Sequence, residues 1–210
     1  MSPLKNLKTR LSFIRPDHLF QAGLIFLSVF LGTIAADWNE NRKEEARTTD
    51  FLVRLSEELS DNQKRIDSSM VYHSRFSKLS DSLFHLLAEK KIPSRFIEYG
   101  GTSKIPGWKG TGFAGLDHSI YQSGYLSGVV SNLPLDLLTQ LSRLQKAQES
   151  YKKFTEELFQ RIVNVKMDTE TSEWVILLNF MGGDLLALEK RISGLNQDVL
   201  SRIRTELERR

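Results

Sequence analysis

An uncharged, apolar run of 18 residues near the start of the sequence constrains this chain more than any other feature. The run covers 19–36, reads LFQAGLIFLSVFLGTIAA, and has Gln21, Ser28 and Thr33 as its only clearly polar members. As an α-helix it would be about 27 Å long at roughly 1.5 Å per residue, close to the hydrocarbon thickness of a bilayer. The sequence therefore predicts a transmembrane helix at 19–36 with the lipid bilayer around it.

Residues suited to a membrane surface flank the run on both sides. After it, ADWNENRKEE (36–45) changes from apolar to charged within a few residues, and Trp38 stands at the change. An indole at the level of the headgroups keeps its ring in apolar surroundings and its N–H hydrated. We therefore expect Trp38 at one membrane interface, and Arg15 and His18 at the other.

The distribution of Lys and Arg predicts the orientation of this helix. Four of these residues precede the run and three lie in 37–50, and the side with more of them stays in the cytoplasm. The expected form is a single-pass protein of the cell inner membrane, with 1–18 cytoplasmic and 37–210 periplasmic or extracellular. A cleaved signal peptide is the alternative. It is less favoured because the run is longer than a typical signal core and TIAA lacks a clear A-x-A cleavage pattern.

Small residues line one face of the expected transmembrane helix. Ser28, Gly32 and Ala36 recur every four residues, a spacing that lets a second helix approach closely in lipid. The pattern indicates pairing with another membrane helix, either of a partner protein or of a second copy of this chain. Chance is the alternative, because small residues are common in membrane spans.

Two short motifs connect the sequence with a known group of proteins. The segment from Ile34 to Lys43, IAADWNENRK, resembles the W-N-E-x-R/K-like signature that ends the span in a family of uncharacterised bacterial single-pass membrane proteins. YQSGYLSGVV, from Tyr121 to Val130, loosely resembles a second segment in the soluble part of that family. The resemblance implies a membrane-anchored helical domain of unknown biochemical role, and it supplies no site residues.

The remainder of the sequence is typical of an all-α domain. A stretch from about 39 to 90 lacks Pro and Gly and repeats apolar residues at helical spacing, which predicts one long helix with a polar, stalk-like first part. Further helices are expected at about 116–129, at 135–166, and from 173 to about 207 with an interruption at Gly182-Gly183. An antiparallel four-helix-type bundle on the stalk is the economical packing. A homo-oligomeric coiled coil is less favoured because the heptads are imperfect.

A glycine-rich loop is expected at 91–115, with a short strand at RFIEY as an option. The loop contains the pattern G-x-G-x-x-G at Gly110, Gly112 and Gly115, the spacing of a dinucleotide-binding turn. In such a turn the glycines follow a buried strand and open a crossover helix. No alternating strand and helix pattern surrounds these glycines, so a flexible connector is favoured over a nucleotide site.

Aromatic and polar residues around this loop indicate a ligand pocket at the end of the bundle. They are Trp108, Phe113, Asp117, His118, Tyr121 and Tyr125. The alternative is that the aromatic side chains only pack the loop onto the core.

Several classes of chemistry find no support in the sequence. The absence of cysteine excludes disulfides, thiolate metal sites and cysteine nucleophiles. No Glu-x-x-His pair, no G-x-S-x-G elbow and no P-loop pattern occurs. A net charge of +3 without a block of like charges argues against nucleic acid as a partner. We expect no catalytic residue, no metal and no cofactor.

These observations predict a non-enzymatic, membrane-anchored module. Its helical domain outside the cytoplasm would bind a partner protein or sense a ligand. The short cytoplasmic segment has no room for an output domain, so any signal would pass through a partner or through self-association. The alternative is a membrane-tethered enzyme with its site at the glycine-rich loop and the mouth of the bundle.

Overall fold

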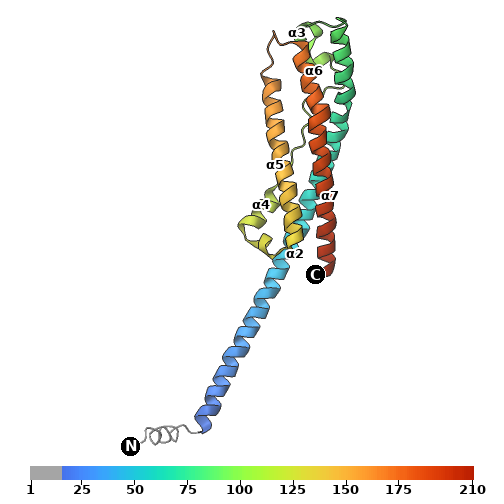
Figure 1. The fold of residues 1–210 in the computed structure, drawn as a ribbon. Helices are drawn as coiled ribbons and strands as arrows, with labels where there is room; N and C mark the ends of the chain where they lie inside the picture. Colours follow the sequence, from blue (N-terminus) through green and yellow to red (C-terminus); the bar gives the residue numbers. More distant parts are fainter. Residues whose placement is uncertain (1–15) are drawn as a thin grey trace, which may run out of the picture. The chain divides into compact units, whose positions relative to one another are not determined.

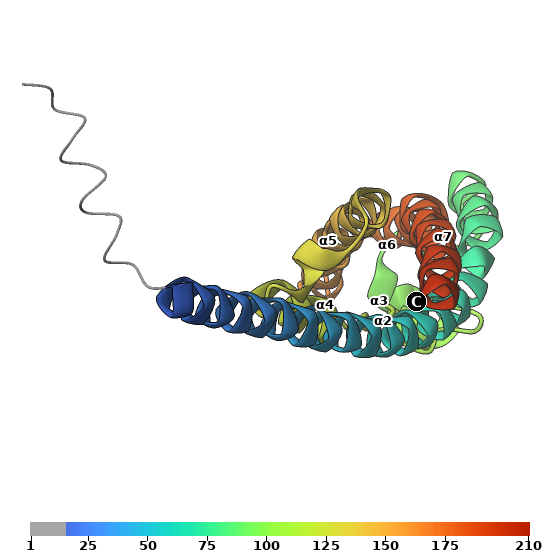
Figure 2. The same cartoon turned by 90° about the horizontal axis from the view of Figure 1, so that it is seen from below.

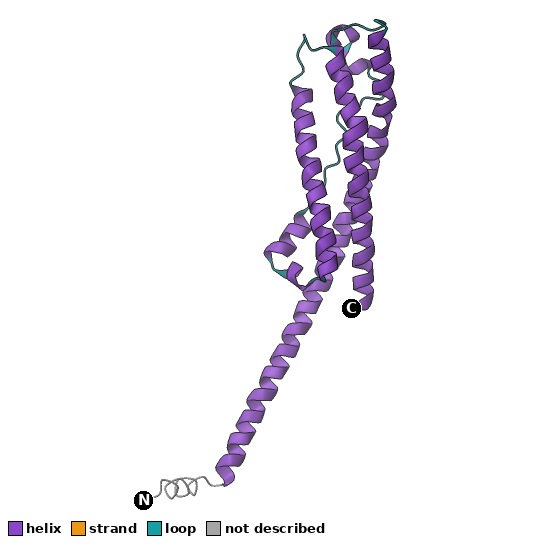
Figure 3. Ribbon diagram, viewed as in Figure 1, coloured by secondary structure: helices purple, strands orange, loops and turns teal. Residues whose placement is uncertain are grey.

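The computed structural model describes residues 16–210, and it describes side chains from residue 20 onward. These residues form helices, turns and loops, and no strand occurs among them (Figure 3). The nearest feature to a sheet in this part of the chain is a single antiparallel bridge between Arg95 and Glu170. The all-α prediction is confirmed. The chain divides into two compact units, 1–47 and 48–210, and each is described by itself.

In the first unit the described residues belong to helix α2 (Pro16–Ala88), which continues into the second unit. Every described side chain up to residue 47 is exposed. This part of α2 is the one described segment that is long and apolar enough to cross a membrane. Its hydroxyl groups bond within the helix, as lipid requires: Ser28 donates to the Leu24 carbonyl and Thr33 to the Phe30 carbonyl, both at 2.8 Å.

The residues expected at the membrane interfaces are described only in part. The Arg42 guanidinium lies 5.2 Å from the centre of the Trp38 ring, a cation–π contact that leaves the indole exposed. Arg15 lies outside the described residues, and the side chain of His18 is not described. The interface positions of these residues stay a prediction.

Helix pairing in the membrane is tested by Gly32→Leu. Nothing in the described structure lies within 4 Å of a methyl group placed at Gly32, so leucine fits the isolated helix and acts only on a second helix. We expect Gly32→Leu to weaken association of the full chain in mild detergent or bilayers, because the two backbones separate. Gly23→Leu is the matched control, since Gly23 is equally open and lies on the opposite face of the helix. An equal effect of both substitutions would contradict pairing through the Ser28, Gly32 and Ala36 face.

The second unit is built on three long helical segments. They are the part of α2 from 48 to 88, α5 (Leu135–Val163), and the run α6 (Thr171–Phe180), η3 (Met181–Leu185) and α7 (Leu186–Arg209). Figure 1 shows α2 and α5 running in the same direction and α7 returning antiparallel to both, and Figure 2 shows the same helices from below.

Apolar side chains at helical spacing on these three segments form the core. The largest fully buried side chains include Leu52, Leu55, Ile66, Phe76, Leu137, Leu144, Leu178, Leu185 and Ile192. Polar contacts join the same helices: the amide of Asn196 donates to the Leu59 carbonyl at 2.8 Å, and Arg202 pairs with Asp136. Burial on α2 begins at Thr48, which agrees with the polar composition just before it.

Two local expectations differ from the structure. The expected helix at 116–129 is shorter, α4 (Ser119–Leu126), and a 3₁₀ turn, η2 (Val129–Asn132), follows it. The optional strand at RFIEY is a single helical turn, α3 (Phe96–Tyr99). Gly100 ends α3 in the left-handed conformation with φ 104°, which a glycine adopts without strain. A second 3₁₀ turn, η1 (Gly101–Lys104), comes next.

The expected interruption at Gly182-Gly183 is a π-helical turn, η3, that joins α6 to α7 without a break. Gly182 lies against the backbone of α2: a methyl group there would come within 2.7 Å of the Phe76 carbonyl carbon, and closer still to the Ser77 nitrogen. Glycine therefore serves as a point of close helix contact at this position.

Candidate functional site

An extended segment from 110 to 118 lies along one face of α2 and takes the place of a fourth long helix. Five of its backbone carbonyls accept hydrogen bonds of 2.6–2.7 Å from side chains of α2. The carbonyls belong to Gly110, Thr111, Gly112, Gly115 and Asp117. Their donors, in the same order, are Tyr72, His73, Ser69, Arg65 and Asn62.

The contacts show that the segment runs antiparallel to α2, because later residues of the segment meet earlier residues of the helix. The backbone N–H of Asp117 returns a bond to the Asn62 side-chain oxygen at 2.8 Å, and the N–H of Ile120 donates to Glu58 at 2.8 Å. A chain without a strand partner must satisfy its backbone groups in another way. The polar face of α2 does so here, and it holds the glycine-rich segment in one conformation.

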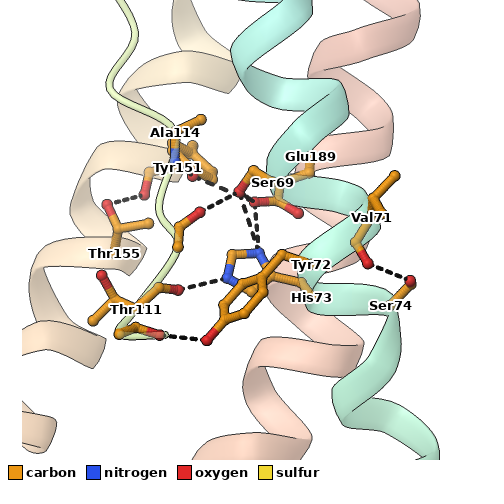
Figure 4. Close-up of polar contacts among 12 residues, drawn as sticks. Ser69, Val71, Tyr72, His73, Ser74, Thr111, Ala114, Tyr151, Thr155 and Glu189 are labelled. Carbon is orange, nitrogen blue, oxygen red and sulfur yellow. Dashed lines mark hydrogen bonds and ion pairs between the residues drawn. The ribbon is translucent and has the colours of Figure 1, made fainter. Parts of the chain in front are cut away.

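A buried polar cluster lies at the centre of this contact (Figure 4). It contains Ser69 and His73 from α2, Tyr151 from α5 and Glu189 from α7, and the side chains of His73 and Glu189 are 0% exposed. One carboxylate oxygen, Oε1 of Glu189, faces the other three groups. It lies 2.8 Å from His73 Nδ1, 2.5 Å from the Ser69 hydroxyl and 3.4 Å from the Tyr151 hydroxyl.

The geometry determines where the protons of this cluster lie. His73 Nε2 lies 2.7 Å from the Thr111 carbonyl, which only accepts, so Nε2 carries a hydrogen. His73 Nδ1 lies 2.8 Å from the Glu189 carboxylate oxygen, within hydrogen-bond distance. The pair joins α2, α7 and the extended segment in a single buried network.

Tyr151 completes the cluster as a neutral group. Burial raises the pKa of its hydroxyl well above the ordinary value, and the nearby Glu189 carboxylate raises it further. Its oxygen accepts a 2.7 Å hydrogen bond from the backbone N–H of Ala114. Oε2 of Glu189 is buried and has no hydrogen-bond partner among the described residues.

The cluster is arranged for support rather than for nucleophilic catalysis. In a catalytic triad the serine bonds one imidazole nitrogen and the acid the other. Here Ser69 and Glu189 both lie at Nδ1 of His73, and Nε2 is occupied by a carbonyl. All three side chains are buried.

A cavity of about 230 Å³ lies beside the extended segment. Its walls come from α2, the start of α4 and α5, which are segments far apart in the sequence. The apolar part of the wall consists of Leu55, Leu59, Leu141 and Leu144, and Tyr121 adds an aromatic surface. A small, mainly apolar cavity with a few polar groups is the usual form of a ligand site.

The polar group that distinguishes this cavity is the amide of Gln148. Its side chain is 5% exposed, it lines the cavity, and its Nε2 has no hydrogen-bond partner among the described residues. An unpaired buried amide group costs about 1–3 kcal/mol.

Charged groups at the rim of the cavity are mostly acidic. Glu58, Asp117, Glu149 and Lys152 line it. The pKa of Asp117 is lowered from its usual value, chiefly by the hydrogen bond from the Ser119 backbone N–H, and Arg65 is the weakest of the contributing causes. The carboxylate of Glu58 accepts bonds from Ser119 and Ile120, which hold the start of α4 beside the cavity.

The structure brings together three of the six residues expected to form a ligand pocket. Asp117, His118 and Tyr121 line the cavity. Trp108 packs between Phe76 and Trp174, with ring centres 5.9 and 5.6 Å away, and so has the packing role considered as the alternative.

The remaining two expected pocket residues also lie elsewhere. Phe113 packs beside His73, with ring centres 6.1 Å apart. Tyr125 is 71% exposed and lines none of the described cavities. The structure therefore does not gather all six residues around one pocket: Phe113 lies on the extended segment, and Trp108, just before it, packs against Phe76 and Trp174.

Gln148, Glu58 and the His73–Glu189 pair were not expected from the sequence. The burial of Glu189 could have been predicted, because Glu189 falls between Leu185 and Ile192 on an apolar stripe at helical spacing. A charged residue on such a stripe is rarely buried without a partner. Its partner His73 lies 116 positions away and had no local signal.

The G-x-G-x-x-G pattern is accounted for by this packing. The carbonyls of Gly110, Gly112 and Gly115 accept hydrogen bonds from Tyr72, Ser69 and Arg65, and no strand precedes them between residues 16 and 109. In the described part of the chain, no group of three or more His, Asp or Glu side chains is placed to hold a metal ion.

Comparison with known proteins adds no relative to this description. No protein-family model, no curated protein and no solved structure matches the chain.

Proposed function

We propose that this chain is a membrane-anchored ligand-sensing module whose helical domain binds a small molecule in the cavity between α2, α4 and α5. The observation that carries the proposal is the cavity itself, which Leu55 of α2, Tyr121 of α4 and Leu141 of α5 line together. A small, mainly apolar cavity with a few polar groups is the usual form of a ligand site. The α2 helix that forms one wall also contains the candidate membrane span, so a ligand here contacts the helix that carries the anchor.

The orientation, the membrane and the family in this proposal are inferred from the sequence. The basic residues before the span favour a cytoplasmic N-terminus, with the helical domain periplasmic or extracellular and the span in the cell inner membrane. The W-N-E-x-R/K-like segment supports kinship with a family of uncharacterised bacterial single-pass membrane proteins. Ligand binding would reach the cytoplasm through a partner protein or through self-association of the span.

A membrane-tethered enzyme is the alternative, and it has less support. The buried Ser69, His73 and Glu189 cluster has no free imidazole nitrogen to accept a proton from a nucleophile. Asp117 and His118 are the titratable residues of the glycine-rich region that line the cavity. Loss of a cellular phenotype in Asp117→Ala or His118→Ala, with unchanged ligand binding and folding, would favour chemistry over sensing.

The proposal is tested by identifying what the cavity binds. The full chain in mild detergent is equilibrated with a small-molecule extract of its native cells, isolated, and denatured, and the released compounds are identified by mass spectrometry. We expect one class of compound to be enriched on the wild-type chain and lost from Gln122→Trp. Gln122 is an exposed residue that lines the cavity, so an indole there occludes the cavity without entering the core.

Gln160→Trp is the matched control. Gln160 is exposed on α5 and lines none of the described cavities, so this variant should retain the compound. Equal recovery of every compound from the wild-type chain and Gln122→Trp would contradict a ligand in this cavity.

A further inference from the structure

An open groove of about 660 Å³ lies between the exposed face of α2 and the extended segment, and its charge has one sign. The described lining contains no Asp or Glu. Its four charged side chains are Lys64, Arg65 and Arg75 from α2 and Lys109 from just before the extended segment. A concave surface lined by charges of one sign concentrates groups of the opposite sign. The groove therefore attracts anions.

Two of these cations are not neutralised by the protein. The side chains of Arg75 and Lys109 make no ion pair within residues 20–210. Arg75 extends towards the loop before the extended segment, since a methyl group at Gly107 would lie 3.9 Å from its Nη1. The backbone N–H of Lys109 donates to the Tyr72 hydroxyl at 3.0 Å, one helical turn from Arg75. Both cations therefore belong to the same end of the groove.

The other two cations mark the opposite end. Arg65 precedes Arg75 by ten residues, about 15 Å along the helix axis. One nitrogen of Arg65, Nη1, donates to the Gly115 carbonyl at 2.6 Å, and the rest of its guanidinium makes no hydrogen bond in the described structure. Lys64 pairs with Asp61 at 2.8 Å. Both members of that pair are exposed, so the pair is weak and leaves Lys64 able to bind another anion.

Neutral side chains line the middle of the groove, among them Ser68, Val71 and Phe113. Val71 is 61% exposed, which leaves an apolar surface between the two cationic ends. A single phosphate or carboxylate is held by donors that converge on one point. Cations about 15 Å apart suit a chain that carries negative charge at two places instead. An extended peptide covers this distance with about five residues at roughly 3.3 Å per residue.

We infer that the groove binds an extended acidic segment of a partner protein. Acidic side chains at one end of the segment lie against Arg75 and Lys109. Acidic side chains about five residues away lie against Arg65 and Lys64, and a short apolar stretch between them covers Val71. The inference goes beyond the proposed function, because it assigns a surface for a partner protein and needs no ligand in the cavity between α2, α4 and α5.

The test uses dye-labelled peptides of one length that differ in charge. Asp-Glu-Ala-Val-Ala-Glu-Asp has acids at both ends, Asn-Gln-Ala-Val-Ala-Gln-Asn is neutral, and Lys-Lys-Ala-Val-Ala-Lys-Lys is basic. Binding to the full chain in a neutral detergent is followed by fluorescence anisotropy. We expect the acidic peptide alone to bind. Its affinity should fall as salt is raised from about 50 to about 300 mM, because salt screens exposed charges.

Substitutions assign the binding to the groove. Arg75→Gln and Lys109→Gln should each weaken binding of the acidic peptide by about fivefold, the upper range for one exposed ion pair. Lys78→Gln is the matched control, since Lys78 is exposed on α2 and lines none of the described cavities. The cavity variant Gln122→Trp should bind the peptide as the wild-type chain does, which separates this inference from the proposed function.

The contrary outcomes are specific. Equal binding of the acidic and neutral peptides, or an equal loss in Lys78→Gln and Arg75→Gln, would overturn the inference and leave the cavity proposal in place. Complete displacement of the peptide by about 1 mM inorganic phosphate would indicate a site for a small anion and would also overturn it. Val71→benzoylphenylalanine tests the surface in the native cells by photo-crosslinking. The crosslinked peptide should be acidic, and crosslinks only to lipid, nucleic acid or uncharged segments would contradict the inference.

Discussion

Replacing Gly182 with alanine should lower the free energy of unfolding by about 3 kcal/mol, the upper range for overpacking in a closely packed core. The added methyl group would lie within 2.7 Å of the Phe76 carbonyl carbon and the Ser77 Cα, and closer to the Ser77 nitrogen. These are backbone atoms of α2, so a side-chain rotation cannot relieve the overlap. The two helices must separate, and the core between them loses contacts.

The neighbouring Gly183 provides the control for this prediction. It belongs to the same π-helical turn, and a methyl group there meets nothing within 4 Å. Gly183→Ala should leave stability unchanged or raise it by up to about 1 kcal/mol, because alanine restricts the unfolded chain. Denaturant unfolding of both variants in detergent, followed by tryptophan fluorescence, measures the difference. Equal stabilities would show that α2 and the turn do not lie in close contact.

Replacing Glu189 with leucine should lower the free energy of unfolding by about 3–5 kcal/mol, the typical cost of removing one partner from a buried ion pair. The substitution leaves His73 Nδ1 without its carboxylate partner and the Ser69 oxygen without its neighbour at 2.5 Å. His73→Leu should cost a similar amount, because the carboxylate of Glu189 then stays buried without its main partner.

A double-mutant cycle distinguishes a coupled pair from two independent side chains. The variant with both leucine substitutions should lose less stability than the sum of the single variants, since replacing both members with apolar groups removes the unpaired charge. Glu208→Gln, an exposed acid on α7, is the control and should change stability by less than about 0.5 kcal/mol. Additive losses would contradict an energetically coupled His73–Glu189 pair.

Much of the helical architecture could be predicted from local pattern. The apolar stripe of α5 predicted the buried face that carries Leu137, Leu141, Leu144, Tyr151 and Leu158. Periodicity of this kind reports which face of a helix is apolar, and burial of that face is the strongest stabilising contribution. The end of α2 at Ala88 is also close to the expected end near Lys90, because Pro93 follows.

The extended segment shows where local pattern fails. Its glycines indicated a flexible connector, because glycine restricts the backbone least. The order in this segment comes from the side chains of α2, which lie about 40–60 positions earlier in the chain and satisfy its carbonyls. Nothing in the sequence of the segment predicts hydrogen-bond partners so far away along the chain.

The candidate site likewise combines residues that the sequence predicted with residues that it did not. Asp117, His118 and Tyr121 were expected because they lie together in the sequence beside an aromatic, glycine-rich loop. Gln148 was not expected, because a glutamine on an amphipathic helix is ordinarily solvated. Its importance depends on the cavity that α2 and α4 form beside it.

The sequence by itself determined the membrane-length apolar helix, the all-α class and the buried faces of the long helices, because each depends on the composition and spacing of neighbouring residues. The tertiary structure alone decided the path of the glycine-rich segment, the π-helical contact at Gly182 and the pairing of His73 with Glu189. It also decided which polar groups meet at the cavity. These features depend on groups that become neighbours only when distant helices pack, and hydrogen bonds and steric contacts act only at that range.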